Sequence, residues 1–187
     1  MIGHLGYDAT NVLDITEAAD VSKGTFYQHF KDKEALTQAL IVEGFEELNR
    51  RINDEFDSPP GSERIRAILR AVFQYASDNR DLFRIMLGPE ASAELNMFAF
   101  TYYAGVVEDI LGRVGIAARA LPYPPVLLAQ FIAGAGVRMG LWWMEDDHGL
   151  SPADMGDIMH QLLTQGISGL LVDNAPPPAA GDPPAHP

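Results

Sequence analysis

The segment SKGTFYQHFKDK, at residues 22–33, carries the side chains whose types and spacing best fit chemistry on a nucleic acid. Hydroxyl, amide and imidazole groups can hydrogen-bond to base edges in a DNA major groove, and the segment supplies them in Thr25, Gln28 and His29. Ammonium and phenol groups can contact phosphates, and they are supplied by Lys23, Tyr27 and Lys33. Gly24 has no side chain, so the backbone there can approach DNA closely.

Charge is distributed unevenly along the chain. The whole sequence has a net charge of −13, which by itself argues against a nucleic acid partner, because binding to phosphates needs Lys and Arg. Residues 22–33 nevertheless hold three lysines against a single acid, Asp32. An acidic body would repel DNA and would turn this one basic segment toward it.

Two short helices joined by a tight turn are predicted to position the segment. The first begins at a cap formed by Thr10 or Asn11, and the second begins at Ser22. Phe26 and Phe30 are four residues apart and face inward, so the polar and basic side chains of the second helix face outward. This arrangement is a helix-turn-helix, in which the second helix enters the major groove.

At these residues the sequence resembles the TetR family of bacterial transcriptional regulators. The similarity extends over residues 10–36 and follows the order of the family pattern through both helices, the turn and the start of the next helix. The matching residues are Thr10, Val12, Asp14-Ile15, Ala19, Val21-Ser22, Gly24-Thr25-Phe26-Tyr27, His29-Phe30 and Lys33-Glu34-Ala35-Leu36.

The resemblance implies an all-α protein with two domains. Residues 1–48 would form an N-terminal helix-turn-helix DNA-binding domain, and residues 49–174 a C-terminal helical domain for ligand binding and dimerisation. The Pro-rich residues 175–187 are predicted to be a disordered tail. The residues expected to contact DNA are Thr10, Ser22, Lys23, Gly24, Thr25, Tyr27, Gln28, His29 and Lys33.

Two features depart from the family pattern. Asp20 stands in the turn where the family usually has Gly, although Asp can adopt the left-handed conformation that such a turn needs. Only Met1–Leu5 resembles the family's first helix, which normally covers the inner side of the two short helices. We expect that an upstream segment supplies the rest of this helix; the alternative is that the chain has lost DNA binding.

The remaining sequence predicts long amphipathic helices and no strands. Ser62 and Ser151 are expected to cap two of them, and the segment Val126–Met144 is apolar almost all round, which predicts burial on two sides. No unbroken apolar run reaches the length of a membrane span, and Cys is absent. A cytoplasmic protein with no membrane association, no cofactor and no metal site is therefore expected.

Large apolar side chains in the C-terminal region predict a pocket for a small apolar or aromatic effector. Arg138 is the most distinctive residue among them, because it lies in one helical stripe with apolar residues. It would either form a structural ion pair with an acid such as Glu94 or Glu108, or anchor a carboxylate or carbonyl of the ligand. The residues expected to line the pocket are Phe73, Phe83, Met86, Met97, Phe100, Tyr103, Arg138 and Trp142.

The last two predicted helices are expected to pair with those of a second copy and build a homodimer. Their apolar stripes are wider than one neighbouring helix can cover. The residues expected at this interface are Ile132, Gly136, Trp143, Met155, Ile158 and Leu162.

These patterns favour a ligand-responsive transcriptional regulator, a repressor released from a palindromic operator in double-stranded DNA by its effector. The alternative is a helical ligand-binding and dimerisation module without DNA binding. A small helical enzyme is the second alternative. It is disfavoured because its candidate acid–base residues show no pairing in the sequence, namely Arg138, Glu90, Glu94 and Glu108-Asp109.

Overall fold

The computed structural model describes Tyr7 and residues 10–57, 60–88, 91–115, 122–146 and 148–172, and the regular structure in these ranges is helical throughout. The predicted all-α class is confirmed. The predictions for Met1–Leu5 and for residues 175–187 lie outside the described residues. The helices are α2 (Val12–Ala18), α3 (Lys23–His29), α4 (Lys33–Asp54), the short 3-10 helix η1 (Glu55–Asp57), α5 (Ser62–Asp78), α6 (Arg80–Leu87), α7 (Ala93–Arg113), α8 (Pro125–Glu145) and α9 (Pro152–Val172).

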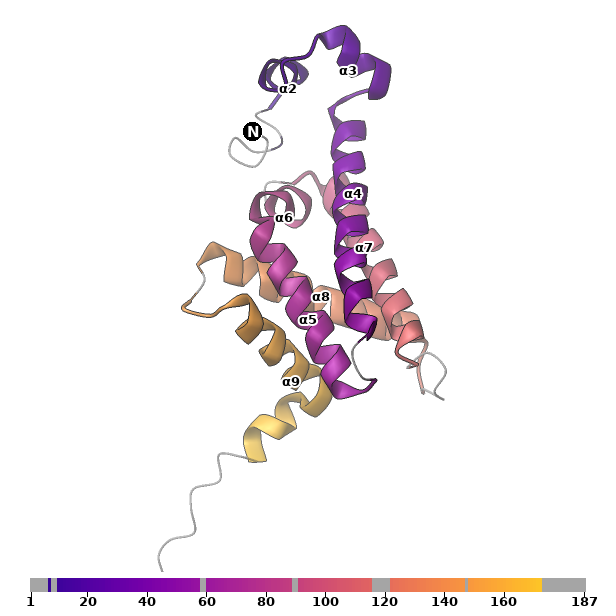
Figure 1. Cartoon of the computed structure of the whole chain (residues 1–187), viewed down its shortest axis with the longest axis vertical. Helices are drawn as coiled ribbons and strands as arrows, with labels where there is room; N and C mark the ends of the chain where they lie inside the picture. The colour runs from indigo at the N-terminus through magenta and orange to yellow at the C-terminus, as the bar shows by residue number, and fades with distance from the viewer. Residues whose placement is uncertain are drawn as a thin grey trace, which may run out of the picture.

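A single helix, α4, joins the two short N-terminal helices to the rest of the molecule. Figure 1 shows α2 and α3 at one end of the molecule and α4 running from α3 into a helical body. In the body α4 packs against α5, α6 and α7, while α7 packs against α8 and α5 against α9. Because α4 is continuous over 22 residues, the predicted domain boundary at residue 48 falls inside a helix. The head formed by α2 and α3 is thus carried on an element that also belongs to the body.

Side-chain caps determine where the two helices of the head begin. The Asn11 side-chain carbonyl oxygen accepts hydrogen bonds from the backbone of Leu13 and Asp14, and the Asn11 N–H donates back to Asp14 at 2.8 Å. The Ser22 hydroxyl accepts a hydrogen bond from the Thr25 N–H at 3.0 Å. Asp20 has a φ of 53°, so it adopts the left-handed turn conformation expected of it.

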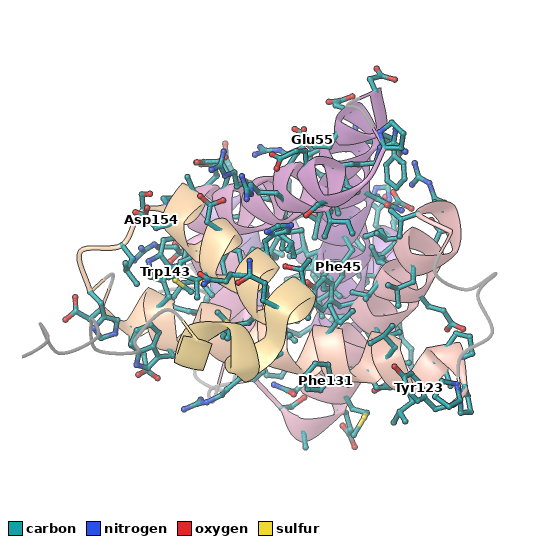
Figure 2. The ribbon with its side chains drawn as sticks, turned by 90° about the horizontal axis from the view of Figure 1, so that it is seen from below. Phe45, Glu55, Tyr123, Phe131, Trp143 and Asp154 are labelled. Atoms are coloured by element: carbon teal, nitrogen blue, oxygen red, sulfur yellow. The ribbon has the colours of Figure 1, made fainter. Side chains whose placement is uncertain are left out.

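Aromatic side chains fill the centre of the body. Phe45 of α4 is completely buried and stacks on Tyr102 and Tyr103 of α7, with ring centroids 5.5 and 5.6 Å apart. Phe73 of α5 meets Trp143 of α8 edge-to-face at 6.1 Å. Figure 2 shows Phe45 in the middle of the bundle. These contacts fix α4, α5, α7 and α8 around one core.

The joint between α5 and α9 is close and partly polar. A Cβ atom at Gly156 would lie 2.7 Å from the backbone of Arg70, so only glycine permits this approach. Arg70 donates two hydrogen bonds to the Asp157 carboxylate, at 2.7 and 2.6 Å. The predicted capping by Ser151 is confirmed, because its hydroxyl accepts a hydrogen bond from the Asp154 N–H at 3.2 Å.

Two local expectations about the helices are wrong. Ser62 does not cap α5: it is the first helical residue, and its hydroxyl lies 2.7 Å from Nε2 of His160 in α9. The sequence predicts that α9 is continuous, but Gly166 has φ 64° and ψ −173°, which kinks it. In both places a tertiary contact or a glycine overrides the local pattern.

Within the described ranges one helix, α8, is long and apolar enough to span a membrane by length and composition. This differs from the expectation that no segment would pass such a test. One side of α8 packs against α7, and 22% of the apolar window is buried. The opposite side exposes Gln130 and Arg138 among apolar residues. A cation is costly in lipid, so this composition fits an interface between proteins better than a lipid-facing helix.

Candidate DNA-binding helix and sensor core

The orientation of α3 is set by aromatic packing. Phe26 is 5% exposed, and its ring lies 5.3 Å from that of Tyr27 and 5.7 Å from that of Phe30. Phe30 is half-buried at the end of the helix. The predicted inward side of α3 is therefore confirmed, and the remaining side chains of the helix project from the head.

The outward side of α3 presents most of the predicted DNA contacts together. The Ser22 and Thr25 hydroxyls are 2.9 Å apart, which holds the Thr25 side chain in one orientation. A Cβ atom at Gly24 would meet only the Ser22 hydroxyl, at 3.5 Å, so no internal contact requires glycine there. The exposed residues of α3 and its cap are Ser22, Lys23, Gly24, Thr25, Tyr27, Gln28 and His29.

Two residues predicted to contact DNA are placed elsewhere. Thr10 is 1% exposed, so its side chain is inside the head rather than on its surface. Lys33 donates hydrogen bonds to the backbone carbonyls of Tyr7 and Thr10, the latter at 2.7 Å, and its ammonium lies 4.0 Å from the centre of the Tyr7 ring. Both positions match the family pattern, but here they hold the head together.

A small apolar cavity lies between α5, α6, α7 and α8, where the effector pocket is expected. Its volume is about 30 Å³, and the predicted residues Phe73, Phe83 and Tyr103 line it. Tyr103 is the polar residue in the lining, and burial raises its pKa to about 12. A Cβ atom at Gly136 would lie 3.4 Å from the Tyr103 hydroxyl, which places this hydroxyl at the cavity wall. The residues that line the cavity are Leu69, Val72, Phe73, Ala76, Phe83, Leu87, Tyr103, Ile132, Gly136, Val137, Gly140, Leu141, Met144 and Met159.

The other predicted pocket residues do not line this cavity. Met86 is buried in the core and Phe100 is half-buried against it. Met97 is 66% exposed and Arg138 is also exposed, so the premise of a buried Arg138 is wrong. Trp142 is 43% exposed and stacks on His148, with ring centroids 4.0 Å apart.

The two faces of α8 are the reverse of those predicted. Ile132 and Gly136, expected at the dimer interface, line the cavity instead. Trp143, also expected there, is 1% exposed and donates its indole N–H to the Leu150 carbonyl at 2.9 Å. The outward face belongs to the stripe that contains Arg138, and Figure 2 shows its residue Phe131 on the outer side of α8. The large apolar residues exposed along α8 are Val126, Leu127, Phe131 and Trp142.

The predicted interface residues of α9 divide in the same way. Met155 is 1% exposed and belongs to the core of its own chain. Ile158 and Leu162 are half-buried, so each keeps some accessible surface in the single chain.

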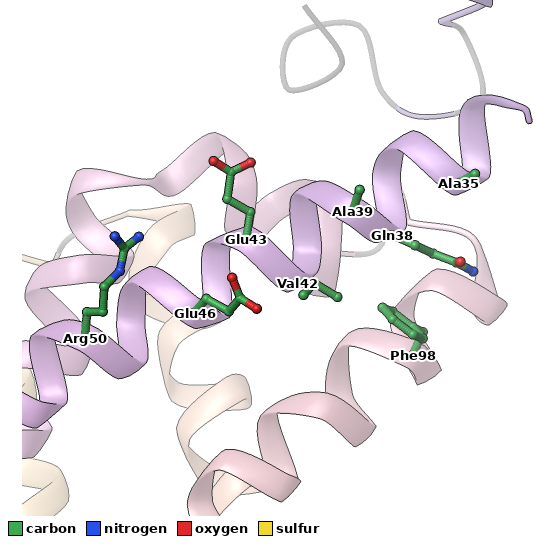
Figure 3. Close-up of a pocket in the computed structure, with 8 residues that line it drawn as sticks. All are labelled: Ala35, Gln38, Ala39, Val42, Glu43, Glu46, Arg50 and Phe98. Atoms are coloured by element: carbon green, nitrogen blue, oxygen red, sulfur yellow. The ribbon is translucent and has the colours of Figure 1, made fainter. Parts of the chain in front are cut away.

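The structure has an open groove along α4 that the sequence does not predict. It has a volume of about 1010 Å³ and lies between α4 and Phe98 of α7 (Figure 3). Ala39 and Val42 contribute apolar walls, and Glu43 and Glu46 add carboxylates. None of the residues predicted to bind ligand line this groove.

The candidates for acid–base chemistry are dispersed on the surface. Glu94, Glu108 and Arg138 are exposed, and Asp109 pairs with Arg113 at 3.7 Å. Glu90 lies outside the described residues. Within the described ranges, no three His, Asp or Glu side chains are close enough together to hold a metal ion.

Comparisons with known proteins match both parts of the chain. A family model described as bacterial regulatory proteins, tetR family, matches residues 1–40, and one described as a transcriptional regulator C-terminal region matches residues 63–165. The HTH-type transcriptional repressor DhaR of Mycobacterium sp. (strain GP1) is 38% identical over 71 residues. That match covers 37% of this chain and 36% of DhaR, so the chain aligns with about a third of that relative.

Other similarities extend over most of the chain at lower identity. The HTH-type transcriptional regulator YhgD of Bacillus subtilis is 22% identical over 174 residues, 87% of this chain and 88% of YhgD. The crystal structure of FadR from Bacillus subtilis in complex with stearoyl-CoA superimposes with a TM-score of 0.71 at 21% identity, covering 88% of this chain and 92% of that one. The helix-turn-helix head, the helical body and the two family models agree: the chain belongs to the TetR family of bacterial transcriptional regulators.

Proposed function

We propose that the chain is a dimeric, cytoplasmic repressor that binds a palindromic operator in double-stranded DNA and releases it when a small molecule enters the body. The observation that carries the proposal is the division of α3. Phe26 is buried in the head, while Thr25, Gln28 and His29 of the same helix are exposed. Such a helix can enter a major groove without rearrangement of the head.

The charges of the chain support a DNA partner for this face. Lys23 and Lys31 are exposed on the head, and the side chain of Lys31 is 90% accessible. Residues 22–33 hold three lysines against one acid, whereas the whole chain has a net charge of −13, so this segment attracts phosphates and the rest of the chain repels them. Encounters with DNA would therefore favour approach through α3.

A second copy is the proposed occupant of the outer face of α8. Leu127 and Phe131 are 57% and 63% exposed there, and solvent exposure of side chains this large is unusual for a soluble helix. Two such faces, with Ile158 and Leu162 of α9 beside them, would form an isologous interface. A stable dimer of this kind buries at least ~1,000 Å² in total. It would place two α3 helices to read half-sites about 34 Å apart.

The cavity between α5 and α8 is the proposed effector site. Its lining is apolar except for Tyr103, and Arg138 is on the outside, so the proposed effector is apolar or aromatic with at most a hydroxyl or carbonyl for Tyr103. The FadR structure in complex with stearoyl-CoA shows that a protein of similar fold binds a ligand with a long apolar chain. A volume of about 30 Å³ is too small for such a molecule, so the effector would select an expanded state of the body.

The proposed signal passes from this cavity to α4 through α6. Phe83 and Leu87 of α6 line the cavity, and Leu82 of the same helix lies against Gly44 of α4. A Cβ atom at Gly44 would be 2.6 Å from Leu82, so the two helices are in close contact. Expansion of the cavity would displace α6 and then tilt α4, which carries the head.

Selection from a random library tests the DNA-binding proposal and identifies the operator sequence in the same experiment. The purified chain is incubated with duplexes that contain a randomised central region, and the bound fraction is amplified through several rounds. We expect an enriched sequence with two inverted half-sites whose centres are one helical turn apart. A dimeric chain that enriches no sequence would instead support the alternative function, a ligand-binding and dimerisation module without DNA binding.

A further inference from the structure

We propose that Lys33 positions the recognition helix by fastening the segment before α2 to the start of α4, and that it does not contact a DNA phosphate. The inference rests on the proposed DNA-binding function, because it concerns how α3 is held for that task. Lys33 is expected to contact a phosphate because of its ammonium group, but the structure gives this group other partners.

Two of the three hydrogen-bond donors of the ammonium are engaged inside the head. A lysine ammonium has three N–H donors and no acceptor. Two point to the backbone carbonyls of Tyr7 and Thr10, and the Tyr7 ring covers the group at 4.0 Å from its centre. A cation over an aromatic face is attracted to it electrostatically. A phosphate that approached this ammonium would meet a group with two donors already engaged and the Tyr7 ring against it.

The hydrogen bonds of Lys33 connect the head to α4 at a second point, in addition to the covalent chain. The covalent connection from α3 to α4 passes through residues 30–32, and the Asp32 side chain caps α4 by accepting from the Ala35 N–H at 2.8 Å. Lys33 adds a second connection, from the first residue of α4 to the residue before the Asn11 cap of α2. Buried Thr10 lies at this joint. Two attachments resist a rotation of the head that one flexible attachment would allow.

Three variants distinguish positioning from a phosphate contact. Lys33→Met removes the charge, Lys33→Arg keeps it on a planar group with different geometry, and Lys23→Met removes one charge from an exposed side chain of the same head. The probes are the duplex enriched by the wild-type chain and a shuffled duplex of equal length and composition. Hydrogen exchange of the α2 amides is measured in the absence of DNA.

For a positioning role we expect Lys33→Met to exchange its α2 amides at least about tenfold faster, because the charge-assisted hydrogen bonds to two carbonyls are lost. Lys33→Arg keeps charged donors, so it should exchange more slowly than Lys33→Met. The preference for the enriched over the shuffled duplex should fall by about tenfold or more, and the dependence of affinity on salt should stay unchanged. A general loss of stability would weaken both duplexes equally, so it would not alter this ratio. Lys23→Met should leave exchange unchanged, weaken both duplexes and reduce the salt slope by about one unit.

The opposite pattern overturns the proposal. A Lys33→Met variant with wild-type exchange and a salt slope reduced by about one unit would make Lys33 a phosphate contact. A Lys33→Met variant that kept the wild-type preference for the enriched duplex would also contradict positioning. Failure of the wild-type chain to enrich any duplex would count against the proposed function, and the exchange measurement would then decide the role of Lys33 by itself.

Discussion

The seven residues of α3 divide by burial in a way that the sequence pattern predicts. Only Phe26 is buried, and the others stand in solvent around the end of the molecule. The sequence pattern is enough to predict this division, because the inward residues recur at helical spacing. The sequence pattern does not predict that Thr10 is buried or that Lys33 bonds backbone carbonyls. A family pattern gives the residue type at a position, but it does not give the groups which that residue contacts.

Gln28 is the side chain with which we would test base recognition. Replacing it with Ala should cost ~1–3 kcal/mol in operator affinity and should relax the preference at one base position, because a side-chain amide can make two hydrogen bonds to a base edge. Operator affinity and a repeated selection with the variant measure the two effects. Gln165→Ala, at an exposed position of α9, controls for the general effect of the substitution. An unchanged sequence preference would remove Gln28 from the recognition surface.

Helix ends are predictable where a side chain beside the helix supplies the cap, as at Asn11, Ser22 and Ser151. By contrast, the sequence does not predict which face of α8 packs against the core of its own chain. Both of its stripes are apolar, and a helical wheel shows that two faces will be covered without showing which neighbour covers each. Trp142 and Trp143 are adjacent and chemically identical, yet one stacks on a surface histidine and the other is in the core.

The contact between α4 and α6 at Gly44 can be tested by a single substitution. Gly44→Ala should lower the free energy of unfolding by about 1–3 kcal/mol, because the new Cβ would overlap Leu82 and push α6 away from α4. Gly105→Ala in α7 is the matched control, since a Cβ atom there meets nothing within 4 Å. It should stabilise the chain by about 0.5–1 kcal/mol through helix propensity alone. Urea denaturation measures both, and a stabilised Gly44→Ala variant would contradict the close contact.

The joint of α5 and α9 should respond to pH through Asp157. The hydrogen bonds from Arg70 lower the pKa of this carboxyl in the folded chain, so folding favours its charged form. The stability that it contributes is present above the ordinary carboxyl pKa, about 3.9, and is lost as the pH falls through the lower folded value. Asp157→Asn should therefore melt at a lower temperature than the wild type at pH 7, and the difference should shrink steadily below pH 4. A difference that stays constant down to pH 2 would exclude this origin.

At the scale of the whole molecule, the proposed dimer would explain the exposed apolar face of α8, and the proposed DNA contact would explain the basic segment at residues 22–33 of an acidic chain. Within the described ranges the face carries Phe131 in the first half of α8 and Trp142 near its end. The proposed dimer would cover this row, which belongs to the helix that is apolar enough to span a membrane.

Phe131→Glu tests whether a second copy of the chain covers the exposed apolar face of α8. The chain has a mass of 20.4 kDa, and sedimentation of the wild type at micromolar concentration should give about twice that value. The variant should sediment as a single chain, because a carboxylate at the centre of an apolar interface loses its hydration without gaining a partner. Leu13→Glu, at an apolar residue of the head that is 43% exposed, should leave the dimer intact. A wild-type chain that sediments as a monomer would refute the dimer.

The continuity of α4 has a mechanical consequence. At 1.5 Å of rise per residue, its 22 residues form a rod about 33 Å long, with Gly44 about 15 Å from the end at Asp54 and the head at the other end. If this rod pivots at Asp54 by ~10°, the tip that bears α3 moves by ~6 Å, roughly the pitch of one helical turn. In a dimer the two tips would move together or apart by about twice that distance, against a half-site spacing of about 34 Å. A displacement of ~2.5 Å where Leu82 contacts Gly44 would thus become a displacement more than twice as large at each tip. The two α3 helices would then no longer fit successive major grooves.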